Sequence, residues 1–194
     1  CEMAEAIAAA FDDGRHVCIE APTGVGKTFA YLVPAIHLAH QVEKPVVIST
    51  HTISLQEQVV QRDLPILAQL MGIECRYAIA KGRSNYVCLR RLGACVENDQ
   101  AYLPSPDLVP ELARIRECVQ STDDGPRSSL ASEPSPTVWD SVCCEIGNCL
   151  NAKCPLCERC FLLKARKRLM SAQIIVANHA LFFSDLGMKL SGTE

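Results

Sequence analysis

The sequence predicts an α/β fold built on a parallel sheet and interrupted by a largely helical, cysteine-rich region. Three observations support this prediction. Short apolar runs alternate with stretches of helical composition, as they do in βαβ units. A glycine-rich segment joins the first apolar run to the first long helical stretch. The chain also contains twelve cysteines, and nine of them lie after residue 87.

Four short apolar runs are expected to form buried strands, because helices cover both faces of a parallel sheet. The expected strands are 16–20, 46–49, 75–80 and 173–177. We place Cys18, on the first of them, in the core. The expected helices are 2–11, 28–41, 53–61, 65–70, 86–96, 107–120 and 158–170. Thr52 is expected to cap the third helix, and Pro34 to kink the second or shift its start.

The segment 20–28 reads Glu-Ala-Pro-Thr-Gly-Val-Gly-Lys-Thr, which between a strand and a helix is typical of a phosphate-binding loop. Gly24 and Gly26 allow unusual torsions and a close approach to phosphate. Lys27 can reach the β- and γ-phosphates of ATP, and the Thr28 hydroxyl can bind Mg²⁺. We therefore assign catalytic roles to Lys27 and Thr28. The residues expected to bind the nucleotide are Ala21, Pro22, Thr23, Gly24, Val25, Gly26, Lys27 and Thr28, with Ala21 where the pattern has glycine.

Composition is that of an ordinary globular protein, with 48% hydrophobic and 21% charged residues among 194. No apolar run is long enough to span a bilayer and no signal peptide opens the sequence, so we expect a cytoplasmic location without a membrane partner. Because the chain opens on Cys1, we expect it to be a fragment. The net charge of −3 gives no hint of a nucleic-acid partner, so any DNA contact must depend on local groups.

Four cysteines crowd residues 149–160, where they occupy positions 149, 154, 157 and 160. Disulfides are rare inside cells, where a phosphate-binding loop belongs, so a metal is the better explanation. The Cys-x₂-Cys-x₂-Cys spacing indicates iron–sulfur ligation, although four thiolates also suit a structural zinc. This local pattern would make Cys157 a ligand. Adjacent cysteines seldom bind one metal, so Cys143 and Cys144 are not expected to be ligands.

The α/β pattern is interrupted and then resumes. Residues 121–137 are rich in Ser, Pro and Asp and are expected to form a flexible loop. We expect residues 1–85 and 171–194 to form one incomplete domain, with 86–170 inserted into it. This insertion is expected to have too few core residues to fold without a metal.

Four stretches together resemble a known family. The first three are residues 20–28, 46–58 and 81–89. The fourth consists of residues 149–161 together with 164–166 and 176–181. In order and spacing they are similar to the XPD-like iron–sulfur helicases of superfamily 2, within the bacterial DinG/YoaA branch. The resemblance implies a RecA-like motor domain 1 of the P-loop NTPases, with an iron–sulfur insertion. It also implies an ATP-dependent helicase that moves 5′ to 3′ along DNA in repair or replication.

The resemblance further implies one structural 4Fe–4S cluster bound by Cys88, Cys149, Cys154 and Cys160, with Cys157 a spare thiol. Contacts with the DNA backbone are implied for Thr50, Gln56, Arg83 and Asn85. The alternative for Thr50 and Gln56 is a helix cap or an exposed polar face, and for Arg83 and Asn85 it is a turn. A basic run near the cluster suits a DNA-facing surface or a solvated helix face; it comprises Lys164, Arg166, Lys167 and Arg168. His179 is expected to position a loop or DNA.

Several parts of the family pattern are not in the sequence: the adenine-sensing glutamine motif, the Asp-Glu-x-His box and the second motor domain. We therefore expect the fragment alone to bind nucleotide weakly without hydrolysing it. The expected partner is single-stranded DNA or a forked duplex, bound by a monomer. Two other functions stay open: a nucleotide-binding scaffold with a structural zinc knuckle, and a redox sensor.

Overall fold

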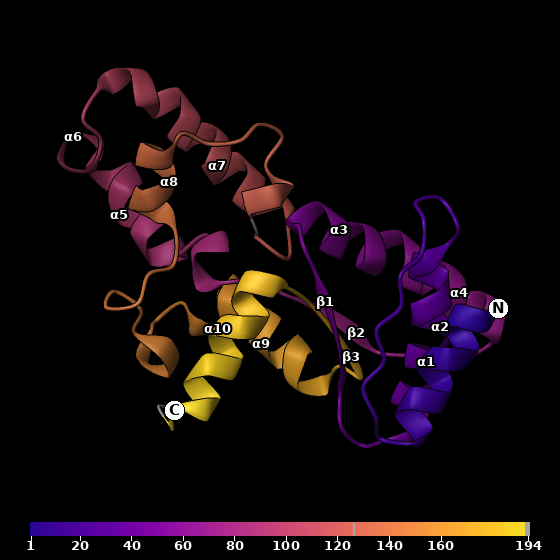
Figure 1. Cartoon of the computed structure of the whole chain (residues 1–194). Coiled ribbons are helices and arrows are strands. Elements are labelled where there is room, and N and C mark those ends of the chain that lie inside the picture. The colour runs from indigo at the N-terminus through magenta and orange to yellow at the C-terminus, as the bar shows by residue number, and fades with distance from the viewer. Residues whose placement is uncertain (126, 193–194) are drawn as a thin grey trace. The chain divides into compact units, whose positions relative to one another are not determined.

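The computed structural model describes residues 1–125 and 127–192. Pro126, in the loop expected to be flexible, and residues 193–194 lie outside the described residues. The chain divides into two compact units. The first combines Cys1–Ala80 with the chain from Arg168 onward, and the second is Lys81–Lys167 (Figure 1).

A parallel three-stranded sheet forms the centre of the first unit. Its strands are β1 (Val46–Thr50), β2 (Tyr77–Ala80) and β3 (Ile174–Asn178), in the order β1-β3-β2. The register places Val46 and Tyr77 on either side of Ile174. Ile174 and Val176 are fully buried, because helices cover the central strand. The strands expected at 46–49, 75–80 and 173–177 therefore form, with shifted ends.

The helices of this unit are α1 (Glu2–Asp12), α2 (Lys27–Gln41), α3 (Ile53–Gln58), α4 (Leu64–Met71) and α10 (His179–Leu190). A π-helical segment, Val59–Asp63, joins α3 to α4 without a break. Leu32 and Ile36 of α2 are fully buried and pack with Ile174 and Val176 of β3. Among the described residues, no helix is both long and apolar enough to cross a bilayer.

The prediction of a strand at 16–20 is wrong. These residues have no regular secondary structure, and no strand in the described part of the chain pairs with them. An extended segment without ladder hydrogen bonds leaves its backbone to water, so its side chains have no sheet to pack into. His16, Val17 and Cys18 are accordingly exposed, which also makes the core placement of Cys18 wrong.

Two local predictions about helices have definite outcomes. Thr52 caps α3, as expected, because its hydroxyl oxygen accepts a hydrogen bond from the Leu55 backbone N–H at 3.2 Å. Pro34 does not shift the start of α2, which begins at Lys27 and continues through the proline. The proline ring is instead buried within the helix.

The second unit is helical and has its own core. Its helices are α5 (Leu89–Glu97), α6 (Asp99–Tyr102), α7 (Val109–Ser121) and α8 (Pro136–Val142), and α9 (Phe161–Ser171) begins in it. Trp139 is 2% exposed, and its indole N–H donates to the Ser84 carbonyl at 2.8 Å. Leu112, Ile115 and Phe161 are buried in the same cluster. The region therefore has a buried core of its own, and whether that core suffices for folding without a metal stays a prediction.

Helix α8 was not expected from the sequence, yet it carries Trp139. Ser135 caps it by accepting from the Val138 N–H, and Pro136 occupies its first turn. The loop before it is partly packed: Gly125 is buried with φ +53, and a Cβ there would lie 2.3 Å from the Phe161 ring. Residues Arg127–Ser129 form a 3₁₀ turn.

Candidate nucleotide loop and cysteine site

The glycine-rich loop has the backbone that its sequence requires. Gly24 and Gly26 adopt φ of 81° and 79°, in the left-handed region that side chains other than glycine rarely enter. Gly26 is the N-cap of α2, a helix of fifteen residues. Because the first N–H groups of a helix lack internal partners, the loop and α2 together present donors suited to an anion.

Lys27 is folded back onto this loop. Its ammonium group donates to the carbonyls of Ala21 at 2.8 Å and Pro22 at 2.5 Å. A phosphate could take the place of these two carbonyls as the acceptor for the Lys27 ammonium. The fold would not have to change, because water could then solvate the loop carbonyls. The next residue, Thr28, is half-buried and hydrogen-bonded to Tyr31. Burial raises the pKa of the Tyr31 phenol, and the Thr28 hydrogen bond opposes that effect.

The carboxyl ends of β1 and β3 bring polar side chains together. The Ser49 hydroxyl lies 2.7 Å from Nδ1 of His179, although the two residues are 130 positions apart. The His51 ring lies 6.0 Å from the His179 ring. Asn178 accepts from the Leu181 N–H at 2.7 Å and so caps α10. The Ser49–His179 pair was not predicted, and its only signal was that both residues lie near the carboxyl ends of strands of one parallel sheet.

Thr50 and Gln56, two of the expected DNA contacts, are buried in this structure. Thr50 is 8% exposed, and its hydroxyl donates to the Thr52 carbonyl at 3.1 Å. Gln56 is fully buried, and its amide nitrogen donates to the carbonyls of Ala80 and Val176, each at 3.1 Å. The Gln56 side chain thus joins Ala80, the last residue of β2, to Val176 in the middle of β3. Its carbonyl oxygen has no partner among the described residues.

We expect Gln56→Met to lower the free energy of unfolding by about 2 kcal/mol, because it leaves the carbonyls of Ala80 and Val176 without their donor, the second of them in a fully buried contact. The control is Gln61→Met, at an exposed position, which should change stability by less than about 0.5 kcal/mol. Urea unfolding measured for both variants checks the prediction. Equal losses of unfolding free energy in the two variants would contradict the prediction.

Arg83 and Asn85, the other two expected DNA contacts, lie in a 3₁₀ turn, Arg83–Asn85, of the second unit. The Asn85 amide donates to the Gly82 carbonyl at 3.2 Å, so this side chain supports the turn. Ser84 contributes its carbonyl to Trp139. Arg83 is half-buried.

Cys88 lies at the N-terminus of α5 and is joined by backbone hydrogen bonds to the segment that follows α8. Its N–H donates to the Val142 carbonyl, and the Cys144 N–H donates to the Tyr86 carbonyl, both at 2.8 Å. Val87 stands opposite Cys143 in this short antiparallel pairing. The pairing uses the residues expected to begin a helix at 86, which is why α5 starts only at Leu89.

The Cys88 sulfur favours the thiolate form. Its pKa is lowered to about 5, chiefly by a hydrogen bond from the Cys144 thiol; the N–H groups of Arg91 and Arg90 act in the same direction, while burial opposes them. The pKa of Cys144 is raised by that same hydrogen bond and by burial.

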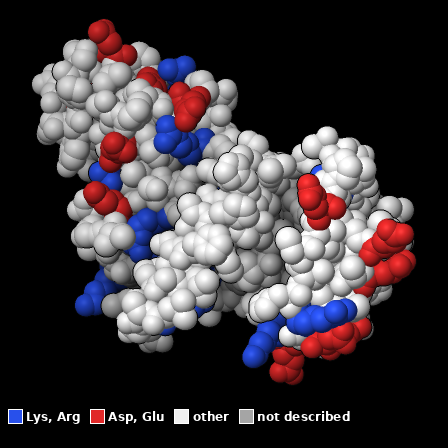
Figure 2. Space-filling view, in the orientation of Figure 1, with Lys and Arg blue, Asp and Glu red and all other residues white. Residues whose placement is uncertain are grey.

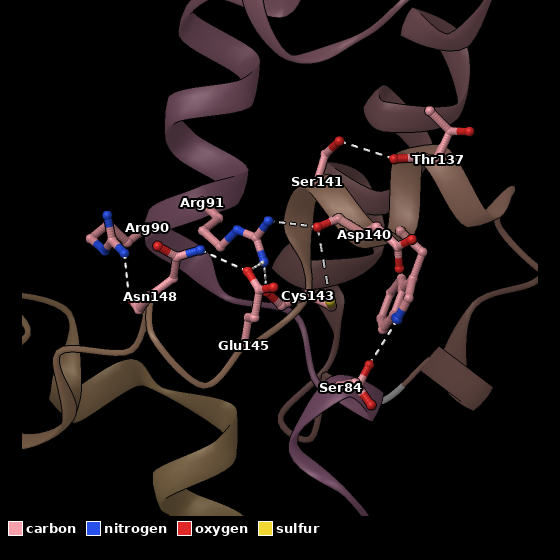
Figure 3. A network of polar contacts seen from close by, with 10 residues as sticks. Ser84, Arg90, Arg91, Thr137, Asp140, Ser141, Cys143, Glu145 and Asn148 are labelled. Carbon is pink, nitrogen blue, oxygen red and sulfur yellow. Dashed lines mark hydrogen bonds and ion pairs between the residues drawn. The ribbon is translucent and has the colours of Figure 1, made fainter.

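Two arginines at the start of α5, Arg90 and Arg91, hydrogen-bond to the backbone of the segment 140–148 (Figure 3). Arg91 donates to the Cys143 carbonyl at 2.7 Å and the Asp140 carbonyl at 2.6 Å. It also lies 3.5 Å from the Glu145 carboxylate. Arg90 donates to the Asn148 carbonyl at 2.5 Å, directly before Cys149. The arginines thereby link the N-terminus of α5 to the backbone beside two further cysteines.

Cys154, Cys157 and Cys160 follow one another through tight turns. The Cys157 N–H donates to the Cys154 carbonyl at 3.0 Å, and the Cys160 N–H donates to the Cys157 carbonyl at 3.2 Å. All three side chains are half-buried. In the part of the chain that the structure describes, no three His, Cys, Asp or Glu side chains converge as around a single metal ion.

A glycine-rich loop with Lys-Thr at the start of a helix, beside a parallel sheet, defines the class of P-loop α/β proteins. Residues 3–99 match the family model described as DEAD/DEAH box helicase. The chain belongs to this family of helicases. The family implies the P-loop, RecA-like fold to which the parallel sheet and the glycine-rich loop conform.

The chain is also similar to individual helicases. It is 38% identical to the ATP-dependent DNA helicase YoaA of Escherichia coli K12, over 98% of this chain and 29% of that protein. It is 36% identical to the YoaA protein of Haemophilus influenzae, with the same coverage of 98% and 29%. The ATP-dependent helicase DinG of Mycobacterium tuberculosis H37Rv is 38% identical, over 95% of this chain and 30% of that protein. The chain thus spans just under a third of the relatives it matches.

Proposed function

We propose that this chain is the N-terminal part of motor domain 1 of an ATP-dependent DNA helicase that moves 5′ to 3′ along single-stranded DNA. The observation that carries the proposal is the Gly24–Gly26 loop capping α2, within a chain similar to DinG and YoaA along almost its whole length. Repair or replication is the proposed setting, and single-stranded or forked DNA the proposed substrate.

In this proposal the nucleotide phosphates bind at residues 21–28. The backbone N–H groups at the start of α2 face the anion, and the Lys27 ammonium exchanges the carbonyls of Ala21 and Pro22 for phosphate oxygens. The Thr28 hydroxyl would be a ligand to Mg²⁺, which neutralises phosphate charge when bound. Because hydrolysis also requires charges supplied from elsewhere in the helicase, we expect this chain alone to bind nucleotide without turnover.

The proposed contacts with DNA must depend on individual side chains, because the net charge of the chain does not attract DNA. Figure 2 shows acidic and basic side chains interspersed on the visible face, in keeping with the net charge of −3. Arg83 is the strongest candidate, because its guanidinium is partly exposed and suits a phosphate. For Thr50, Gln56 and Asn85 a contact with DNA stays a prediction, since their side chains have hydrogen-bond partners within the chain.

We further propose that Cys88, Cys149, Cys154 and Cys160 bind one 4Fe–4S cluster. The donor set fits chemically, because a 4Fe–4S cluster takes four cysteine sulfurs and these four cysteines are free thiols with half-buried side chains. Arg90 and Arg91 add positive charge that suits an anionic group. When bound, the cluster would cross-link α5 to the 149–160 segment.

The test of the cluster is metal content with a visible spectrum, on protein purified without oxygen. We expect about four irons per chain and broad absorbance near 400 nm. Cys88→Ser should lose most of the iron. The matched control is Cys157→Ser, a change to another half-buried thiol, which should keep the iron. One zinc and no iron, or iron loss in the Cys157 variant alone, would contradict the assignment.

A further inference from the structure

A row of aromatic rings lies at the carboxyl ends of β1 and β3, apart from the nucleotide loop and the cysteines. The register pairs Thr50 with Asn178, the last residues of these strands, so His51 and His179 leave the sheet side by side. Their ring centroids are 6.0 Å apart. Phe183 lies one turn further along α10, on the same face as His179, and the centroids of these two rings are 6.4 Å apart. The three rings therefore form one continuous aromatic row within the first unit.

The aromatic row is both accessible and ordered. His51 and His179 are exposed, and Phe183 is 61% exposed. Neighbouring rings of the row are tilted by 57° and 56°, so none of them lies flat over the face of the next. A hydrogen bond of 2.7 Å between the Ser49 hydroxyl and Nδ1 of His179 fixes the central ring. Phe182 packs edge-on against Phe183, with ring centroids 5.2 Å apart, and supports the last ring.

The chemistry of the row suits a nucleobase better than an apolar protein surface. Two of the three rings are imidazoles, whose nitrogen atoms water can solvate, so the row does not require an apolar cover. Every base has a flat π-face that can stack on an aromatic ring, whatever the sequence. Stacking does not depend on net positive charge, which the chain, at −3, does not have. In open α/β sheets, ligands also bind outside the carboxyl ends of the strands, where this row lies.

We infer that His51, His179 and Phe183 form a stacking platform for a base of single-stranded DNA. The inference rests on the proposed function, because it requires that the chain binds DNA. It adds that the first unit contacts the bases as well as the backbone of the strand. Affinity should therefore depend on the presence of the bases, whereas contacts with phosphates alone would not distinguish a normal strand from an abasic one.

Two strands of equal length and charge test the inference: oligothymidine, and an abasic strand with the same sugar–phosphate backbone. The Kd for each strand is measured with this chain by fluorescence anisotropy at one fixed salt concentration, since phosphate contacts depend on salt. The test variants are Phe183→Leu, which keeps an apolar side chain without the ring, and His51→Leu. The matched control is Phe11→Leu, which changes an exposed phenylalanine of α1 in the same unit.

We expect the wild-type chain to bind oligothymidine at least about fivefold more tightly than the abasic strand, the difference that one stacked base makes. Phe183→Leu and His51→Leu should each lower this ratio toward one and leave the affinity for the abasic strand unchanged. Phe11→Leu should keep both values.

Two results would overturn the inference while leaving the proposed function in place. One is a wild-type ratio of one, which would show that the bases are not contacted. The other is a wild-type ratio in both test variants, which would assign the aromatic row to a contact with protein. Failure of the wild-type chain to bind either strand would instead overturn the proposed binding of DNA by this chain, and the stacking platform with it.

Discussion

Lys27→Ala in the full-length helicase should lower the rate of ATP hydrolysis by at least about 100-fold, the loss typical when one preorganised charge facing a transition state is removed. The ammonium donates to two loop carbonyls, so its removal costs hydrogen bonds that water can replace. The loop torsions depend on Gly24 and Gly26, which the substitution leaves in place. The defect should therefore lie in catalysis and phosphate binding and leave the fold unchanged.

The measurement is DNA-stimulated phosphate release at saturating ATP, with circular dichroism to confirm folding. Lys44→Ala is a suitable control, because Lys44 is an exposed lysine that follows α2 in the same unit. Its activity should match that of the wild type. Hydrolysis by the Lys27 variant within about threefold of wild type would contradict the assignment of Lys27 to the phosphates.

Trp139→Ala should destabilise the second unit by about 3–5 kcal/mol, the usual cost of truncating a buried tryptophan. The indole is 2% exposed and provides the donor to the Ser84 carbonyl. Whole domains are stabilised by only about 5–15 kcal/mol, so a loss of this size should bring Lys81–Lys167 close to unfolding.

Hydrogen exchange distinguishes this outcome from a global effect. Amides of α5, α7 and α8 should lose protection in Trp139→Ala, while those of β1 and β3 keep theirs. Trp139→Phe retains most of the packing and loses only the indole donor, so it should cost about 1–2 kcal/mol. Unchanged protection in the second unit of Trp139→Ala would mean that this core does not hold the unit together.

Sequence reasoning succeeded where the signal is local. The torsions of Gly24 and Gly26, the Thr52 cap and the three paired strands all follow from residues within a few positions of each other. It failed where partners are distant. A strand at 16–20 needs a neighbour that its own residues cannot reveal. Helix α8 lies beyond a polar stretch, and only the burial of Trp139 identifies its inward face.

The same contrast between local signals and distant partners applies to the candidate sites. The backbone of the glycine-rich loop could be predicted from its spacing alone. The burial of Gln56 could not be predicted in this way, because the two carbonyls that accept from its side chain lie 24 and 120 residues away. The pairing of Val87 with Cys143, which joins the start of α5 to the end of α8, is formed by residues more than fifty positions apart. A pattern of adjacent cysteines carried no sign of it.

The strand order β1-β3-β2 has a consequence for how the chain folds. β1 and β2 never pair with each other, since each pairs only with β3, which comes last in the sequence. During synthesis, the first two strands and their helices must wait until roughly one hundred further residues have emerged. Such distant pairing is slow, and it leaves strand edges exposed to aggregation meanwhile. The unit Lys81–Lys167, between β2 and β3, has its own core. If it folds first, it brings its two ends closer together, which lowers the entropy cost of pairing β3 with the earlier strands.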